Sequence, residues 1–162
     1  MLLKSFMKKI FLILFCLLPF TFVQGQTFEV KVVNVVDGDT FDGMNRDGLV
    51  LRFRINAIDT PERGQAYCNV ATNYLKSLIA GKNIKVSVKE KDRYGRFIAT
   101  PYTPNGDDVS LLMLQNGMAW HYSRYDNTLS YANAEKQARE KRIGLWADNN
   151  PINPEQYRRA KR

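Results

Sequence analysis

The chain is 162 residues long, has a formal net charge of +8 and contains one histidine and two cysteines. So few His and Cys residues exclude a zinc site built from them, and a lone histidine argues against a catalytic triad or histidine phosphotransfer. The basic charge favours an anionic partner, such as nucleic acid or a membrane surface, through a long-range field and not through a specific contact.

Residues 1–25 are predicted to be a secretory signal peptide. Three lysines precede the apolar run from Ile10 to Val23, and the small residue Gly25 follows it, which is typical of a cleavable signal. Cleavage would leave Gln26 first and lower the formal charge to +5, because three lysines and no acids are lost. A membrane anchor is the alternative, but the run is short for a bilayer span. We expect a secreted or periplasmic protein without stable membrane association after cleavage.

The remaining chain is predicted to form one domain, residues 26–148, followed by a basic tail, residues 149–162, expected to be a frayed and solvated end. Cys68 is the single cysteine after cleavage, so no intramolecular disulfide can form. We expect Cys68 to be a small buried thiol and the protein to be a monomer, although pairing between chains is the alternative.

Residues 27–100 mainly predict strands. "FEVKVVNVV" is followed, beyond a turn, by "TFDGM", which we expect to be its hairpin partner. "LVLRFRINAI" and "NIKVSVK" alternate apolar with polar residues, so each should have one buried face. "RFIATPY" adds a strand that Pro101 is expected to end. The side chains expected on the buried faces are Leu49, Leu51, Phe53, Ile55, Ile84, Val86 and Val88.

Three segments predict helices that end at glycines. They are "AYCNVATNYLKSLIAG", ending at Gly81, "DVSLLMLQNG", ending at Gly117 with Asp107 as its N-cap, and "YANAEKQAREKRIG", ending at Gly144. One helix between the third and fourth of five strands suits a small barrel. The order predicts a mainly β fold with α elements, an OB-fold five-stranded β-barrel with three helices.

Acidic residues gather at the expected bends. "VVDGDTF" places Asp37 and Asp39 on either side of a glycine, and "RINAIDTPER" places Asp59, Thr60 and Glu62 where a proline ends a strand. Their hard oxygen donors suit calcium or magnesium. Each motif taken singly is also explained as an ordinary turn.

Arginines accompany these acids. Arg54 lies five residues before Asp59, and "KDRYGRFIA" supplies Asp92, Tyr94 and Arg96 around a glycine turn. Arginine matches phosphate oxygens with two parallel hydrogen bonds. Carboxylates, a hard cation and arginines could together stabilise the charge that grows on phosphorus as water attacks.

The combination of motifs resembles the staphylococcal nuclease family. The resemblance covers about Phe28 to Trp146 and rests on "VVDGDTF", "LRFRINAIDTPE", "KDRYGR", "LQNGMAW" and "EKQAREKRIGLW". It implies an OB barrel with three helices that cleaves DNA and RNA with calcium and releases products with a 3′-phosphate.

The resemblance also implies roles for individual residues. Asp39, Asp59 and the carbonyl of Thr60 match calcium ligands, with Asp37 as a supporting neighbour. The remaining matches are Arg54 and Arg96 as catalytic arginines and Glu62 as the carboxylate that activates or orients the attacking water. Because arginines keep their protons, they would act through charge and geometry.

Two tyrosines are candidates for substrate contact. Tyr125 matches one pocket tyrosine of the family by count, whereas the other position falls on Ser123, with Tyr122 adjacent. Tyr94 and Tyr125 could stack on bases or contact phosphate, and packing is an equally open alternative. The connection "RGQAY" after Glu62 is shorter than the mobile loop of the best-known member, so its lid motion is not expected here.

We therefore expect a secreted, calcium-dependent nuclease that hydrolyses DNA and RNA, preferably single-stranded or denatured, with little sequence specificity. Direct in-line hydrolysis without a covalent intermediate is the expected mechanism. A non-catalytic OB-fold nucleic-acid-binding module is the alternative. Loss of catalytic residues would favour that module, but every matched catalytic position is filled.

Overall fold

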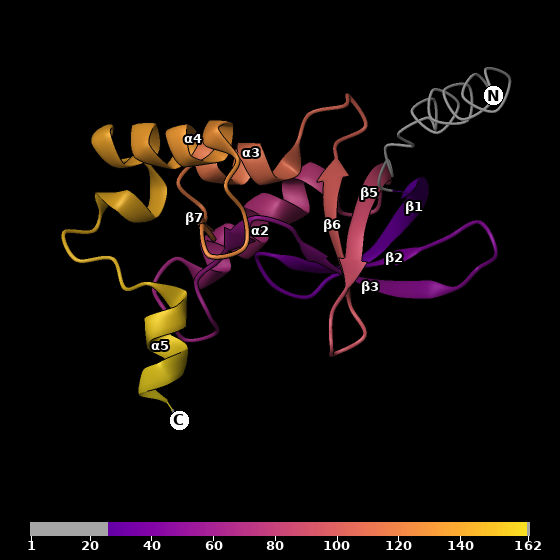
Figure 1. Cartoon of the computed structure of the whole chain (residues 1–162), viewed down its shortest axis with the longest axis horizontal. Coiled ribbons are helices and arrows are strands. Elements are labelled where there is room, and N and C mark those ends of the chain that lie inside the picture. The colour runs from indigo at the N-terminus through magenta and orange to yellow at the C-terminus, as the bar shows by residue number, and fades with distance from the viewer. Residues whose placement is uncertain (1–25, 162) are drawn as a thin grey trace, which may run out of the picture.

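The computed structural model describes residues 26–161, so the predicted signal peptide lies outside the described residues. Five strands form a closed barrel in the order β1-β2-β3-β6-β5, shown in Figure 1. The barrel strands are β1 (Gln26–Val35), β2 (Thr40–Met44), β3 (Val50–Ile55), β5 (Asn83–Lys91) and β6 (Phe97–Tyr102). The OB-fold barrel is therefore confirmed.

The predicted hairpin of β1 and β2 is confirmed by antiparallel pairing of these strands. The remaining neighbours are also antiparallel except β3 and β6, which run parallel. A parallel pair requires a long crossover. Helix α2 (Cys68–Ile79) lies in that connection, between the third and fourth barrel strands, as predicted.

The barrel interior is filled by apolar side chains from alternating strand positions. Phe41 and Phe53 stack with their ring centroids 5.1 Å apart, and both are fully buried. The expected burial of Leu49 is wrong, because this residue is 60% exposed. Strand β3 begins only at Val50, and Leu49 belongs to the preceding turn, where its N–H donates to the Asn45 side chain.

Pro101 does not end strand β6. The strand continues to Tyr102, and Pro101 lies opposite Val86 of β5. The other neighbour, β3, pairs with β6 only as far as Ala99. Pro101 thus lies where β6 has one partner strand, and there its missing N–H removes no ladder hydrogen bond.

Two helix boundaries differ from the prediction. Helix α3 (Val109–Gln115) is capped by Asp108, whose Oδ1 accepts a hydrogen bond from the Leu111 N–H, and not by Asp107. The side chain of Asp107 instead accepts from the Thr103 hydroxyl. Asp108 is correctly placed because an N-cap must immediately precede the first helical residue.

Gly144 does not end the third predicted helix. Helix α4 (Leu129–Glu140) ends earlier, and Gly144 begins the 3-10 helix η1 (Gly144–Ala147). A Cβ on Gly144 would lie 2.3 Å from the carbonyl oxygen of Gly117. Gly144 is therefore required for close approach of two chain segments and not for a helix terminus.

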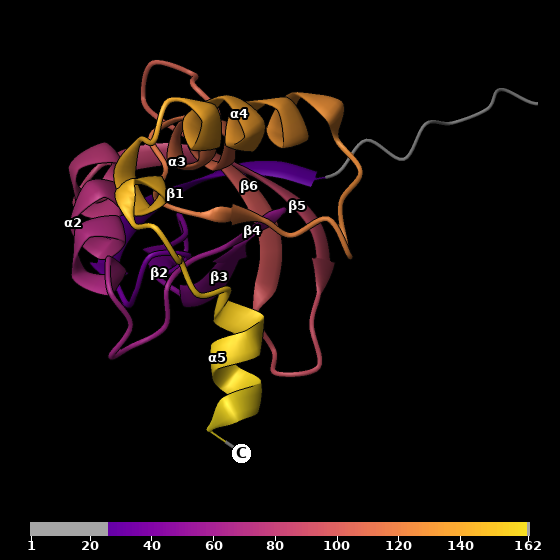
Figure 2. The same ribbon diagram turned by 90° about the vertical axis from the view of Figure 1, so that its left-hand side faces the viewer.

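The C-terminal tail is not a frayed end. It forms α5 (Pro154–Ala160), the fourth α-helix among residues 26–161, whose N-cap Asn153 accepts a hydrogen bond from the Glu155 N–H. Figures 1 and 2 show α5 standing apart from α3 and α4, which lie together. Within residues 26–161, no helix combines the length and apolar character needed to cross a membrane.

Candidate functional site

Strand pairing brings the predicted acidic bends together. Thr40, the first residue of β2, lies opposite Arg54 of β3, so the neighbouring Asp39 comes close to the Arg54 side chain. Asp59 lies in the short strand β4 (Ile58–Asp59), which pairs with β7 (Trp120–His121). Residues 20 positions apart in the chain thus meet at one end of the barrel.

Arg54 joins the two predicted metal-ligating aspartates. Its Nη1 lies 2.9 Å from Oδ2 of Asp39, and its Nη2 lies 3.1 Å from Oδ1 of Asp59. All three side chains are largely buried, so the interaction is poorly screened by solvent. Carboxylates buried in this way need a positive partner, because an unpaired buried charge is strongly unfavourable.

Asp39 is also held by Thr60. The backbone N–H and the hydroxyl of Thr60 both donate to Oδ2 of Asp39, at 3.0 and 2.8 Å. The approach of the two segments depends on Gly38, where a Cβ would lie 2.7 Å from the Thr60 hydroxyl oxygen. Gly38 is therefore needed for space between the two bends.

Asp37 supports Asp39 without a described contact to Arg54. Its Oδ1 accepts a hydrogen bond from the Asp39 N–H at 3.1 Å. Burial, together with the negative charge of Asp39, raises the pKa of Asp37 to about 6. Asp37 thus lies beside Asp39, and its supporting role at a metal site stays a prediction.

Asp59 is the most deeply buried carboxylate of the site, with its side chain 3% exposed. Burial raises its pKa, against the opposing effects of a hydrogen bond from Arg158 and the charge of Arg54. Asp59 therefore depends on nearby positive groups to remain ionised without a large energetic cost.

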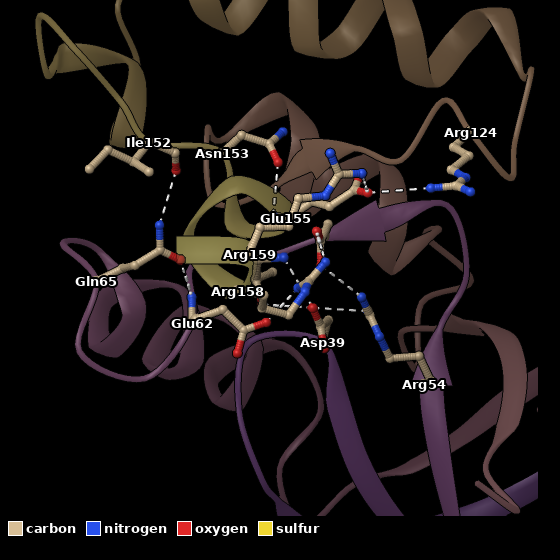
Figure 3. A network of polar contacts seen from close by, with 12 residues as sticks. Asp39, Arg54, Glu62, Gln65, Arg124, Ile152, Asn153, Glu155, Arg158 and Arg159 are labelled. Atoms are coloured by element: carbon tan, nitrogen blue, oxygen red, sulfur yellow. Dashed lines mark hydrogen bonds and ion pairs between the residues drawn. The ribbon is translucent and has the colours of Figure 1, made fainter. Parts of the chain in front are cut away.

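Arg158 is a residue of this site that sequence reasoning missed. Its Nη1 and Nη2 lie 3.0 and 2.8 Å from Oδ1 and Oδ2 of Asp59, and its Nη1 lies 2.5 Å from Oε1 of Glu62. Hydrogen bonds to Asp59 raise the pKa of Arg158 above its ordinary value. Figure 3 shows Arg158 and Arg54 reaching the carboxylates from different sides, from α5 and β3.

The start of α5 could have been recognised in the sequence. "NPE" from Asn153 to Glu155 combines an N-cap residue, a proline in the first turn and an acidic residue beside the helix N-terminus. Nothing in that pattern indicates where the helix docks. The contact with Asp59 joins residues 99 positions apart, so it is decided by the fold.

The structure brings Glu62 next to Asp59 through their shared partner, Arg158. The backbone N–H of Glu62 donates to the side-chain oxygen of Gln65, and this hydrogen bond fixes the bend that carries Asp59 and Glu62. The Glu62 side chain is 37% exposed, in contrast to Asp59. Glu62 is therefore the carboxylate of this pair that solvent water can reach.

Arg96 lies on the turn between β5 and β6. Its Nε is 2.8 Å from Oδ2 of Asp92, and its guanidinium faces the ring of Tyr94. Among the contacts of the described residues, none joins Arg96 to Asp39 or Asp59. Its predicted catalytic role stays a prediction.

Neither candidate tyrosine packs in the core. Tyr94 and Tyr125 are 69% and 59% exposed, and each lies beside an arginine, Arg93 and Arg124 respectively. Tyr122 packs edge-on against Tyr125. Burial, together with the charge of Asp59, raises the pKa of Tyr122.

His121, the single histidine of the sequence, is a packing residue. It lies in β7, its Nε2 is 3.3 Å from Asp126, and its side chain is 4% exposed. Its ring also packs edge-on near the Tyr131 ring. Cys68 is partly buried and is a free thiol.

The donor groups fit a hard divalent cation. Within residues 26–161, no three His, Cys, Asp or Glu side chains are arranged to hold a metal. The predicted set uses only two carboxylates, from Asp39 and Asp59, together with the carbonyl of Thr60. Both carboxylates are buried and both bind guanidinium groups, so both are placed to bind a positive group. Oxygen donors of this kind suit calcium.

Sequence comparisons find proteins similar to this chain among nucleases. The family model described as staphylococcal nuclease homologue matches residues 52–148. An uncharacterized endonuclease of Haemophilus influenzae is 39% identical over 82% of this chain and 74% of its own length. A micrococcal nuclease of Shigella flexneri is 38% identical over 82% of each chain, and a staphylococcal-like nuclease of Arabidopsis thaliana is 43% identical over 73% of this chain and 37% of its own.

Proposed function

Because this chain belongs to the staphylococcal nuclease family, we propose that it is a calcium-dependent nuclease that hydrolyses DNA and RNA with little sequence specificity. It is a hydrolase of the phosphodiester bond, as the names of its relatives support. The observation that supports this most directly is the pairing of one arginine, Arg54, with two buried carboxylates, Asp39 and Asp59, beside a more exposed third carboxylate.

The surroundings of the residues support the roles that we propose for them. Glu62 accepts a proton from, or orients, the water that attacks phosphorus, since it is accessible and is not counted among the metal ligands. Arg54, fixed by Asp39 and Asp59, binds a phosphate oxygen and stabilises the developing negative charge. Arg96, on the turn between β5 and β6, is proposed as the second arginine that binds a phosphate oxygen.

Asp39, Asp59 and the carbonyl of Thr60 would hold the calcium ion, with Asp37 behind them. Calcium bound there would add positive charge next to the phosphate and help to position the reacting groups. In the proposed reaction, the water oxygen bonds to phosphorus and the bond from phosphorus to the 5′ oxygen breaks. The products are a 3′-phosphate and a 5′-hydroxyl.

The substrate and location are also part of the proposal. Exposed Tyr94 and Tyr125 would stack on unpaired bases, which favours single-stranded or denatured nucleic acid. We propose that the protein acts as a monomer, secreted or periplasmic, after removal of residues 1–25. Finding Gln26 at the N-terminus of the exported protein would support cleavage, and finding Met1 there would contradict it.

The deciding experiment compares digestion by the purified protein with calcium and with a chelator. Denatured DNA and RNA should both be degraded with calcium, degradation should stop on chelation, and added calcium should restore it. Polynucleotide kinase should label the new 5′ ends without prior phosphatase treatment, because they are hydroxyls. Binding without digestion at any calcium level would instead support the non-catalytic OB-fold module.

A further inference from the structure

Arg158 occupies both oxygens of a proposed calcium ligand. Its two terminal nitrogens bind Oδ1 and Oδ2 of Asp59 in parallel, and Nη1 also binds Glu62. This two-pronged geometry is the strongest that arginine makes with a carboxylate. A metal ion on Asp59 would need at least one of the same oxygens.

Charge makes the competition stronger than the shared oxygens alone. Three carboxylates, from Asp39, Asp59 and Glu62, face two guanidinium groups, from Arg54 and Arg158. An arginine cannot release its proton to reduce repulsion with a nearby cation. When Arg158 leaves, three negative groups face one positive group, and this balance favours a divalent cation.

Few other contacts attach α5 to the molecule. The helix has 7 residues, and its one buried residue is Pro154. Beyond Arg158, the described polar contacts of residues 152–161 with the rest of the chain join Gln65 to the carbonyl of Ile152 and Arg124 to Glu155. Both are exposed, so they add little to stability.

Packing under the tail is also incomplete. A cavity of about 170 Å³ lies between the loop after Pro61 and the tail, and residues on its two sides include Tyr67, Ile152 and Tyr157. A short terminal helix with little buried apolar surface opens at low energetic cost. Docking of α5 therefore depends heavily on the ion pairs of Arg158.

We propose that Arg158 is an internal cation that competes with calcium for Asp59, so that calcium binding and docking of α5 exclude each other. This inference rests on the proposed calcium site. In the absence of calcium, Arg158 neutralises Asp59, binds Glu62 and keeps the site closed. Calcium displaces the guanidinium, α5 undocks, and Glu62 is released to act on water.

The test is a calorimetric titration of calcium into the purified wild-type protein and its variants. Arg158→Gln should bind calcium about tenfold tighter. The substitution removes the ion pairs that stabilise docked α5, so a larger fraction of the molecules has Asp59 free to bind calcium. Arg158→Lys should lie between, since it keeps the charge but loses the paired geometry. Arg159→Gln is the matched control, because Arg159 is on the same helix and, among the described residues, pairs with Glu155 and with neither Asp59 nor Glu62. It should bind as the wild type does.

Hydrogen exchange on the wild-type protein gives a second readout that needs no mutation. Amides of residues 155–160 should exchange faster with calcium than with a chelator, because docking is lost. Equal calcium affinity in the wild type and in Arg158→Gln, or a calcium-independent exchange rate in α5, overturns the inference while leaving the calcium site in place. No calcium binding by any variant overturns the proposed site and the competition together.

Discussion

Asp59 and Glu62 lie on the same bend but have different surroundings. Asp59 is almost fully buried between two arginines, whereas the Glu62 side chain is 37% exposed and touches only the arginine of the C-terminal helix among its described side-chain contacts. A buried and paired carboxylate suits a fixed electrostatic task. An accessible one suits proton transfer with water.

Glu62→Gln should lower kcat by at least about a hundredfold and leave KM nearly unchanged, because a proton-accepting or water-orienting group acts mainly in the transition state. Initial rates on denatured DNA at saturating calcium would measure both constants. Glu140→Gln, an exposed glutamate on α4 paired with Lys136, is the control and should behave as wild type. Parallel losses of substrate binding and rate would show that Glu62 has a structural role.

At the residue scale, the acids and Arg54 could be found in the sequence because their motifs are local. Asp39, Asp59 and Arg54 are each adjacent to a turn or strand end that the sequence predicts, and the structure joins them. Arg158 could not be found in this way. Its role depends on a contact across most of the chain, and its own neighbours, "QYRRAKR", are those of an ordinary basic helix end.

At the scale of elements, the junction of α3 and α4 is fixed by one polar contact in an apolar setting. Tyr131 of α4 donates its hydroxyl to Oδ2 of Asp108, at 2.5 Å. The other oxygen of Asp108 caps α3. A single carboxylate thus caps the start of α3 and attaches α4 to it. Burial, and to a lesser extent this hydrogen bond, raises the pKa of Tyr131.

Tyr131→Phe should reduce the free energy of unfolding by about 1.5 to 3 kcal/mol, the usual loss for a hydrogen bond to a charged group. Denaturant titration followed by circular dichroism measures it. Tyr102→Phe is the control, because the Tyr102 hydroxyl has no hydrogen bond among the described contacts, and it should change stability by less than about 0.5 kcal/mol. Equal effects of the two substitutions would mean that the contact with Asp108 contributes nothing.

The ends of elements could be predicted where a local sequence signal sets them. The predictions were wrong where tertiary packing sets the end of the element. The first predicted helix ends next to Gly81, as expected, because a glycine with positive φ follows it. Gly144 has the same appearance in the sequence but serves a close approach to Gly117. The two uses of glycine cannot be separated without knowing which segments meet.

At the scale of the whole molecule, net charge should contribute mainly to substrate binding, which precedes the chemical step. The predicted mature chain has a formal charge of +5, and a basic, aromatic-bearing turn joins β5 and β6. The exposed residues of this turn region include Lys89, Lys91, Arg93 and Tyr94. Long-range attraction to a polyanion and release of its counterions should contribute much of the affinity.

Binding of a single-stranded oligonucleotide, measured by fluorescence anisotropy with a chelator present, should weaken steeply with salt. Lys91→Gln should reduce the slope of log Kd against log salt by roughly 0.7, the value for one phosphate contact on a single strand. Arg46→Gln removes the same charge beside Glu29, at the turn of β2 and β3, and is the matched control. Similar slope changes for both variants would argue against binding through the turn of β5 and β6.

The sequence by itself determined the barrel, its crossover helix and the acidic and basic motifs, because alternation, caps and bends depend on neighbouring residues. Only the tertiary structure decided that Arg54 joins Asp39 to Asp59 and that α5 brings Arg158 to the same carboxylates. These contacts depend on strand register and on docking of the chain's end. Neither the strand register nor the docking of the chain's end produces a periodic pattern in the sequence.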